Sequence, residues 1–158
     1  MKQQERRTWA EISLPNLEHN YRALRALLPE GCRFLGVVKA DAYGHGAVQV
    51  SRTLQELGAD YLAVSSIDEA AELRSGGITM PILILGHVQP AYAAALIQND
   101  ITVACYSLAQ AHALSEAAVA AGGRVHIHLK ADTGMGRIGF ALRTDFDKAI
   151  AEMLEACA

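Results

Sequence analysis

The sequence has few aromatic residues, few cysteines and no long apolar run, and each shortage excludes a class of protein. Phe, Trp and Tyr make up 6% of the 158 residues. The longest apolar stretches, such as Ile82–Leu85, are far too short to cross a bilayer, so we expect no membrane partner. The three cysteines, Cys32, Cys105 and Cys157, are odd in number and lack C-x-x-C spacing. This excludes a disulfide framework and a zinc knuckle, and it is typical of thiols in a reducing compartment.

The charge balance also lacks a basic excess. The chain has 14 Lys and Arg residues against 17 Asp and Glu residues, and its formal net charge is −3. We therefore expect no nucleic-acid partner. The segment Met1–Trp9 is charged and has no apolar run of the kind found in secretory signals, which predicts a cytoplasmic protein. Hydrophobic residues make up 51% of the chain, which argues against intrinsic disorder.

Short apolar runs alternate with helical segments along the whole chain. The runs begin near residues 33, 60, 82, 101 and 125. This repeat of about 23 residues suits one strand and one helix. Alternation of this kind indicates βαβ units and a parallel sheet. The predicted fold class is therefore α/β, with about five strand–helix units whose parallel strands form a barrel or a sheet.

Several helical segments carry start signals. A first helix is predicted over 15–28. In the segment before it, Thr8–Ile12, polar and apolar residues alternate weakly, which allows a strand. Ser66 and Glu69 have the spacing of a capping box, in which we expect the side chain of each residue to accept a free N–H group of the other. Further helices are predicted over 47–57, from 66 to 76, after residue 90, over 108–121 and from about 144.

Chemically reactive side chains follow the apolar runs rather than precede them. In parallel α/β folds, functional groups gather on the loops after the carboxyl ends of the strands. The first run is followed by Lys39, and the fifth by Lys130 and Arg137. The opposite loops carry residues typical of turns, such as Gly122 and Gly123. This asymmetry predicts a site at one end of the sheet.

Lys39 ends an apolar strand, where partial burial favours the neutral, nucleophilic form of its amine. A lysine that forms a Schiff base needs this environment. Position alone also allows a lysine with a buried stem and a solvated ammonium group. The segment Gly44–Gly46 opens a helix, so its backbone is able to approach an anion there, or it forms an ordinary turn.

The last run is followed by two cations, Lys130 and Arg137, which indicate an anion in the site. A salt bridge from Lys130 to Asp132 is the alternative. His126 and His128 share a strand face with Lys130, and we interpret them as barrel histidines rather than as metal ligands. No metal site is predicted.

Two segments resemble the signatures of one family. Residues 37–46, VVKADAYGHG, look like the cofactor-lysine signature of bacterial alanine racemases, and residues 129–140, LKADTGMGRIGF, look like the second signature of that family. The opening segment Trp9–Leu14, followed by a helix that contains Asn20, is also similar. The resemblance covers nearly all of the chain, in order and with the family's spacing. It implies an isomerase that uses pyridoxal 5′-phosphate (PLP) to interconvert L-alanine and D-alanine, and so supplies D-alanine for cell-wall peptidoglycan.

The resemblance also implies roles for four residues. Lys39 would be the catalytic residue, since it would bind PLP through its amine and act as the base on one face of the substrate α-carbon. Tyr43 would donate a hydrogen bond to the cofactor phosphate. Arg137 would approach the phenolic oxygen of PLP and the substrate carboxylate. Lys130 would be a carbamate that orients Arg137.

Proteins of this family have an N-terminal barrel and a C-terminal β-domain, and they act as head-to-tail homodimers. We therefore expect residues 1–158 to form a partial (β/α)₈ TIM barrel, because about five strand–helix units are present and a closed barrel has eight. This would be the N-terminal part of the barrel domain, without the C-terminal domain. The second base of the family is a tyrosine from the partner subunit's C-terminal domain, so we expect the chain alone to lack full racemase activity. One alternative is a non-catalytic half-barrel that binds PLP or self-associates through unpaired edge strands. Another is a racemase of serine or another small amino acid.

Overall fold

A computed structural model describes residues 8–156 of the chain. The charged segment Met1–Arg7 and Cys157 lie outside the described residues. The helices are α1 (Leu14–Ala26), α2 (Lys39–Gly44), α3 (Ala47–Glu56), α4 (Ile67–Ser75), the 3₁₀ helix η1 (Pro90–Tyr92), α5 (Ala93–Gln98), α6 (Leu108–Ala120) and α7 (Phe146–Glu155). The strands are β1 (Leu35–Val37), β2 (Tyr61–Val64), β3 (Ile82–Ile84), β4 (Ile101–Cys105), β5 (Ile127–Leu129), β6 (Ala131–Asp132) and β7 (Phe140–Ala141).

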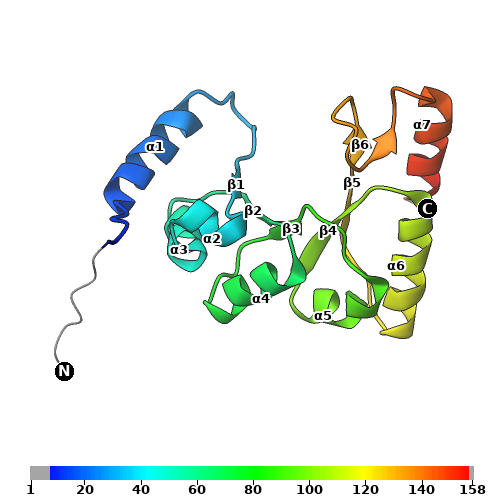
Figure 1. The fold of residues 1–158 in the computed structure, drawn as a ribbon, viewed down its shortest axis with the longest axis horizontal. Helices are drawn as coiled ribbons and strands as arrows, with labels where there is room; N and C mark the ends of the chain where they lie inside the picture. The colour runs from blue at the N-terminus through cyan, green and yellow to red at the C-terminus, as the bar shows by residue number, and fades with distance from the viewer. Residues whose placement is uncertain (1–7, 157–158) are drawn as a thin grey trace.

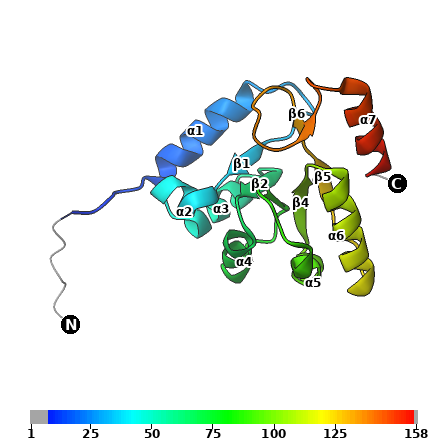
Figure 2. The ribbon, with the colours of Figure 1, turned by 45° about the vertical axis from the view of Figure 1, so that its right-hand side comes forward.

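The main sheet has five parallel strands in the order β1-β2-β3-β4-β5. Each strand pairs with its neighbour in the sequence, beginning with Leu35 opposite Tyr61 and ending with Cys105 opposite Leu129. A doubly wound sheet reverses its strand order at some point, whereas this order never reverses. Helices α4 and α5 lie on one side of the sheet in both views (Figures 1 and 2). The fold is therefore a partial (β/α)₈ barrel, and the prediction is confirmed.

Side-chain caps set the first residues of the longer helices. Ser13 Oγ accepts the amide of Asn16 at the start of α1, at 3.3 Å. The same pattern, with a bond to the residue three positions on, starts α4, α6 and α7. Pro15 fits the first turn of α1, where its missing N–H leaves no hydrogen bond unmade. The starts of these four helices are therefore predictable from the local sequence.

The predicted boundaries hold closely for most elements. Strands β2 and β4 begin at Tyr61 and Ile101, within one residue of the predicted starts near 60 and 101. The segment Thr8–Ile12 is not a strand, so that expectation is wrong. The sequence also gave no sign of α2 or of the short parallel pair β6 and β7. Both lie in the two segments that resemble the family signatures.

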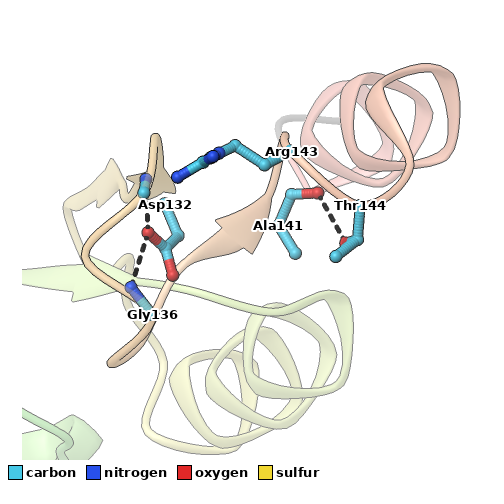
Figure 3. Close-up of a pocket in the computed structure, with 6 residues that line it drawn as sticks. Asp132, Gly136, Ala141, Arg143 and Thr144 are labelled. Atoms are coloured by element: carbon cyan, nitrogen blue, oxygen red, sulfur yellow. Dashed lines mark hydrogen bonds between the residues drawn. The ribbon is translucent and has the colours of Figure 1, made fainter.

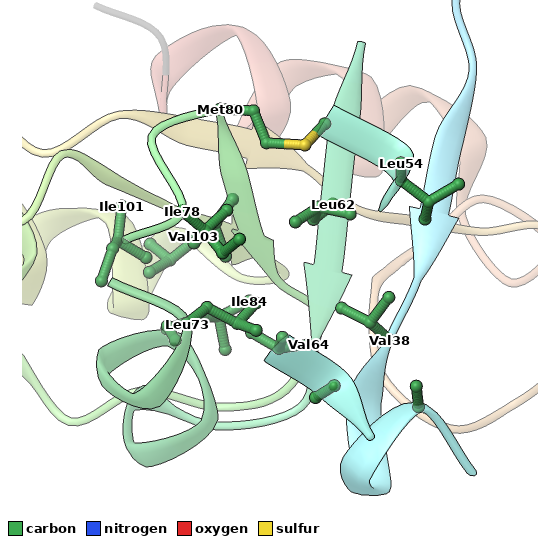
Figure 4. Close-up of a cluster of buried hydrophobic side chains, with 14 of the residues drawn as sticks. Val38, Leu54, Leu62, Val64, Leu73, Ile78, Met80, Ile84, Ile101 and Val103 are labelled. Atoms are coloured by element: carbon green, nitrogen blue, oxygen red, sulfur yellow. The ribbon is translucent and has the colours of Figure 1, made fainter. Parts of the chain in front are cut away.

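The core lies between the sheet and the helices on its outer face (Figure 4). Buried strand residues such as Leu62, Ile84 and Val103 belong to the same cluster as Leu54 and Leu73 of α3 and α4. Full burial of one such side chain contributes about 1.5–3 kcal/mol. The other face of the sheet is less covered.

On that opposite face, Leu35 and Val37 of β1 are 38% and 41% exposed. Nearer the centre of the sheet, Tyr61 Oη lies 2.7 Å from Thr102 Oγ1, and its ring lies against His128 with the centroids 5.5 Å apart. Among residues 8–156, no helix is both long enough and apolar enough to cross a membrane.

Candidate active site

Lys39 lies at the carboxyl end of β1, as predicted. The strand ends at Val37, and the next amide, that of Val38, still donates to Ala63 O of β2 at 2.9 Å. Val38 is buried, and Lys39 is half-buried. The sheet therefore fixes the backbone immediately before Lys39, and it places this residue at the end of the sheet where functional loops gather.

The chain after Lys39 forms a left-handed helical turn. Residues Ala40, Asp41, Ala42 and Tyr43 have φ values of 51° to 55° and ψ values of 38° to 50°. None is glycine, and left-handed backbone costs an ordinary L-residue roughly 1–2 kcal/mol. Four such residues in a row persist only where surrounding contacts hold them. Strained backbone of this kind is common at functional sites.

Contacts within the turn and at its C-terminal side account for part of that support. Asp41 Oδ1 accepts the amide of Ala47, the first residue of α3, at 2.7 Å. Asp41 O accepts the amide of Gly46 at 3.0 Å. Ala42 is buried in the main core. The Asp41 carboxylate thus takes the first amide of α3, which the sequence interpretation had left available for an anion.

Glu69 supports the other side of the turn. Its Oε1 accepts the amide of Ala40 at 2.8 Å, and its Oε2 accepts the amide and the hydroxyl of Ser65 at 2.7 and 2.8 Å. The capping box is therefore only half formed: Ser66 Oγ accepts the Glu69 amide at 3.3 Å, but the Glu69 carboxylate binds Ser65 and Ala40 instead of the Ser66 amide. It joins the loop after β1 to the loop after β2.

The hydrogen bonds also affect the ionisation of Glu69. Partial burial acts to raise the pKa of this carboxyl group, but the N–H groups of Ser65, Ala40 and Ser66 and the Ser65 hydroxyl outweigh it. The pKa of Glu69 is therefore held below its ordinary value. The carboxylate is ionised at neutral pH.

Tyr43 ends the left-handed turn, and 62% of its surface is exposed. Its phenol is accessible at the same end of the sheet as Lys39. The turn and the residue directly before it therefore carry both residues of the first signature that the resemblance assigns to the cofactor.

Lys130 directly follows β5, at the opposite edge of the sheet from Lys39. Its Nζ donates to Leu85 O at 3.4 Å, so the side chain reaches across β4 to the end of β3. The expected alternative, a salt bridge from Lys130 to Asp132, is not formed. The ammonium group is directed toward the middle of the sheet.

Asp132 instead organises the glycine-rich loop that follows (Figure 3). Its Oδ1 accepts the amides of Gly134 and Gly136 at 2.9 and 3.1 Å. These bonds, with the nearby Arg143 guanidinium, hold the pKa of Asp132 below its ordinary value. Asp132, Arg143 and Thr144 line a pocket of about 380 Å³.

Gly139 closes the same loop. Its φ is +147°, and a Cβ there would lie 2.6 Å from the amide nitrogen of Asp132. Only glycine allows this approach, which lets the Phe140 amide bond Lys130 O at 2.8 Å. Arg137, within the loop, is exposed, and no residue between 8 and 156 forms an ion pair or hydrogen bond with it. Its guanidinium is available to a ligand.

The structure places the two signatures at one end of the sheet but on opposite edges of it. Lys39 and Tyr43 follow β1, whereas Lys130 and Arg137 follow β5. Within the described part of the chain, no hydrogen bond or ion pair joins the two groups. The hydrogen bond from Lys130 Nζ to Leu85 O shows that this side chain extends from the β5 edge of the sheet toward the β1 edge.

The described residues contain no group of three or more His, Cys, Asp and Glu side chains able to hold a metal ion. Among the cysteines, Cys32 is half-buried and Cys105 is buried in β4. The His87 ring, in the loop after β3, bonds Tyr106 Oη at 2.7 Å. Of these groups, Cys105 contacts the second signature through its backbone, since it pairs with Leu129 and its carbonyl oxygen accepts the amide of Lys130 at 2.7 Å.

The fold and the site together define a class: a barrel enzyme domain with a half-buried lysine after its first strand and cations after its fifth. Residues 12–158 match the family described as "Alanine racemase, N-terminal domain". The chain therefore belongs to the alanine racemase N-terminal domain family.

Individual relatives agree with this assignment. The chain is 45% identical over 150 residues to alanine racemase 2 of Caldanaerobacter subterraneus subsp. tengcongensis, which covers 95% of this chain and 38% of that protein. The solved alanine racemase of Clostridium difficile 630 superimposes with a TM-score of 0.89 at 42% identity, covering 98% of this chain and 40% of that one. A histidine racemase from Leuconostoc mesenteroides subsp. sake has a TM-score of 0.80 at 30% identity, over 95% and 40% of the two chains. The chain thus spans about two fifths of the length of these relatives.

Proposed function

We propose that this chain forms part of a PLP-dependent alanine racemase, in which Lys39 binds the cofactor and serves as the base on one face of the substrate. The observation that carries the proposal is the position of Lys39: half-buried at the carboxyl end of β1, directly before a strained turn and within the family's cofactor-lysine signature. Backbone strain and a half-buried amine in one segment favour a functional role over a structural one.

The residues present fit the cofactor. PLP offers an aldehyde, a phosphate and a phenolic oxygen, and the chain offers an amine at Lys39, an exposed phenol at Tyr43 and an exposed guanidinium at Arg137. The amine suits the aldehyde, and the phenol and the guanidinium suit the anionic oxygens. When bound, PLP withdraws electrons from the substrate and acidifies its α-proton.

Each residue then has a defined task. Lys39 Nζ receives and returns the α-proton on one face of the substrate. Arg137 holds the substrate carboxylate and so fixes which bond faces the base. Tyr43 donates to the phosphate. We further propose that Lys130 carries a carbamate, which would turn its repulsion toward Arg137 into attraction and orient that guanidinium.

The wider setting follows from family membership and is part of the proposal. Residues 1–158 form the N-terminal part of a barrel domain in a cytoplasmic enzyme that supplies D-alanine for peptidoglycan. The enzyme acts as a homodimer.

Proton exchange in D₂O tests the role of Lys39. The chain is incubated with PLP and either L-alanine or D-alanine, and loss of the α-proton signal is followed by NMR. We expect exchange of one enantiomer to exceed the rate with PLP alone, and the excess to disappear in Lys39→Ala but persist in Lys148→Ala. Exchange unchanged in Lys39→Ala would reject the assignment.

Racemisation by the same samples tests the requirement for a second base. Because Lys39 supplies one base, we expect little of the opposite enantiomer to form. Turnover by the 158-residue chain comparable to that of a complete racemase would contradict the one-base account.

A second candidate is racemisation of another amino acid, and the histidine racemase neighbour favours considering it, because its similar fold serves a different side chain. The exchange measurement repeated with serine and histidine separates the two functions. Fastest exchange with alanine supports the first proposal, and fastest exchange with another amino acid supports the second.

A further inference from the structure

The Glu69 carboxylate bridges the segments that follow two neighbouring strands, β1 and β2. Oε1 binds the amide of Ala40, 29 positions earlier in the chain, and Oε2 binds the amide and hydroxyl of Ser65. Ala40 is the first residue of the left-handed turn. Glu69 is thus the long-range partner of the turn at its entrance, while Asp41 secures its exit.

Only an ionised carboxylate satisfies this arrangement. Both of its oxygens accept from backbone N–H groups, at 2.8 and 2.7 Å. A glutamine has one acceptor oxygen and one NH₂ group, so either orientation would direct NH₂ at an N–H donor. An uncharged acid has the same deficiency, since one of its oxygens carries a proton.

A purely local role in α4 does not account for these contacts. A glutamate at the third helical position often binds the amide of its own N-cap residue, which here is Ser66. The Ser66 amide lies close enough to Glu69 to help lower its pKa, but the hydrogen bonds of the carboxylate go to Ser65 and Ala40. The neighbouring Asp68, also in the first turn of α4, is exposed, and no residue in the described part of the chain forms a hydrogen bond or ion pair with it. Asp68 is therefore a suitable control for Glu69, because it lies in the same turn of α4 but does not contact the turn after Lys39.

We infer that Glu69 is a positioning residue, which holds the strained turn after Lys39 so that the Lys39 amine and the Tyr43 phenol face the same ligand. The expected effect on ligand binding rests on the proposed function. The role of Glu69 in holding the turn does not depend on it. Loss of the bridge frees the Ala40 amide and lets the turn relax to ordinary backbone, which moves Tyr43 relative to Lys39. The fold remains, because the core beneath the turn does not depend on Glu69.

Amide exchange without cofactor tests the structural part. Hydrogen–deuterium exchange is followed by NMR in the unmodified chain, in Glu69→Gln and in Asp68→Asn, with the amides of Leu62 and Ile84 as core references. We expect at least tenfold faster exchange of the Ala40 amide in Glu69→Gln, no change at the two reference amides, and unmodified rates in Asp68→Asn. Equal rates at Ala40 in all three proteins would overturn the inference, as would equal acceleration in both variants.

Labelling by PLP tests the consequence. The rate at which borohydride fixes limiting PLP on Lys39 is compared in the same three proteins at equal fraction folded. We expect at least a fivefold fall in Glu69→Gln and none in Asp68→Asn. If Ala40 exchange accelerates while Lys39 labelling is unchanged, the positioning role is overturned even though the bridge is real. If Lys39 is not labelled in the unmodified chain, the proposed function fails, and the exchange result still decides whether Glu69 holds the turn.

Discussion

Asp41 Oδ1 accepts the amide of Ala47 at 2.7 Å, so a residue of the left-handed turn caps the helix that follows it. Removal of a side-chain cap costs about 1 kcal/mol. We expect Asp41→Ala to lower the free energy of unfolding by about that amount. Asp41→Asn keeps an acceptor oxygen and tolerates left-handed backbone, so its loss should be a few tenths of a kcal/mol. Urea unfolding measures both, and equal losses would contradict the capping role.

The handedness of the turn makes one substitution informative. Ala40 is exposed with φ +51°, where glycine is free of strain. We expect Ala40→Gly to leave the free energy of unfolding unchanged or raise it by up to about 1 kcal/mol, because relief of strain offsets the greater freedom of the unfolded chain. Ala23→Gly, at an exposed position within α1, should instead lower it by about 1 kcal/mol. Losses of the same size in both variants would show that the turn is not left-handed in solution.

Arg74 of α4 ties together the loops at the other end of the sheet. Its guanidinium donates to four carbonyl groups at 2.8–2.9 Å, those of Ile78, Met80, Asn99 and Asp100. Lysine keeps the charge but lacks the planar fork, so Arg74→Lys should lower the free energy of unfolding by about 2 kcal/mol. The control, Arg22→Lys, alters an exposed pair with Glu18 and should change it by less than about 0.5 kcal/mol.

The sequence predicted the fold better than it predicted the site. Apolar runs and helix caps are local signals, so β2, β4 and the start of α4 were readable directly. The left-handed turn was not, because no glycine occupies residues 40–43 and its support comes from Asp41 and from Glu69, 29 positions away from Ala40.

Residue types indicated which positions belong to the candidate site, but not which groups their side chains bind. Lys39 and Lys130 fall at strand ends, as expected, but the hydrogen bond from Lys130 to Leu85 O spans 45 positions. Glu69 resembled an ordinary capping glutamate, since S-x-x-E says nothing about which amide its carboxylate binds. Long-range contacts of this kind are decided by tertiary packing.

Acid should weaken the Glu69 bridge. The pKa of Glu69 lies below its ordinary value of 4.5, so the stability that it contributes is complete above that value and is lost as pH falls through the folded-state pKa. We expect the difference in free energy of unfolding between the unmodified chain and Glu69→Gln to be constant near neutral pH and to shrink below about pH 4.5. Urea unfolding across this range measures it. A difference that does not shrink in acid would show that the Glu69 charge contributes nothing.

We propose Lys39 as the residue that binds PLP. The chain has four lysines, Lys2, Lys39, Lys130 and Lys148, so covalent capture can be assigned to one of them. The chain is mixed with substoichiometric PLP, reduced with borohydride and mapped by peptide mass spectrometry. We expect the label on Lys39, its loss in Lys39→Ala and its retention in Lys148→Ala. A label recovered mainly on another lysine, or undiminished in Lys39→Ala, would contradict it.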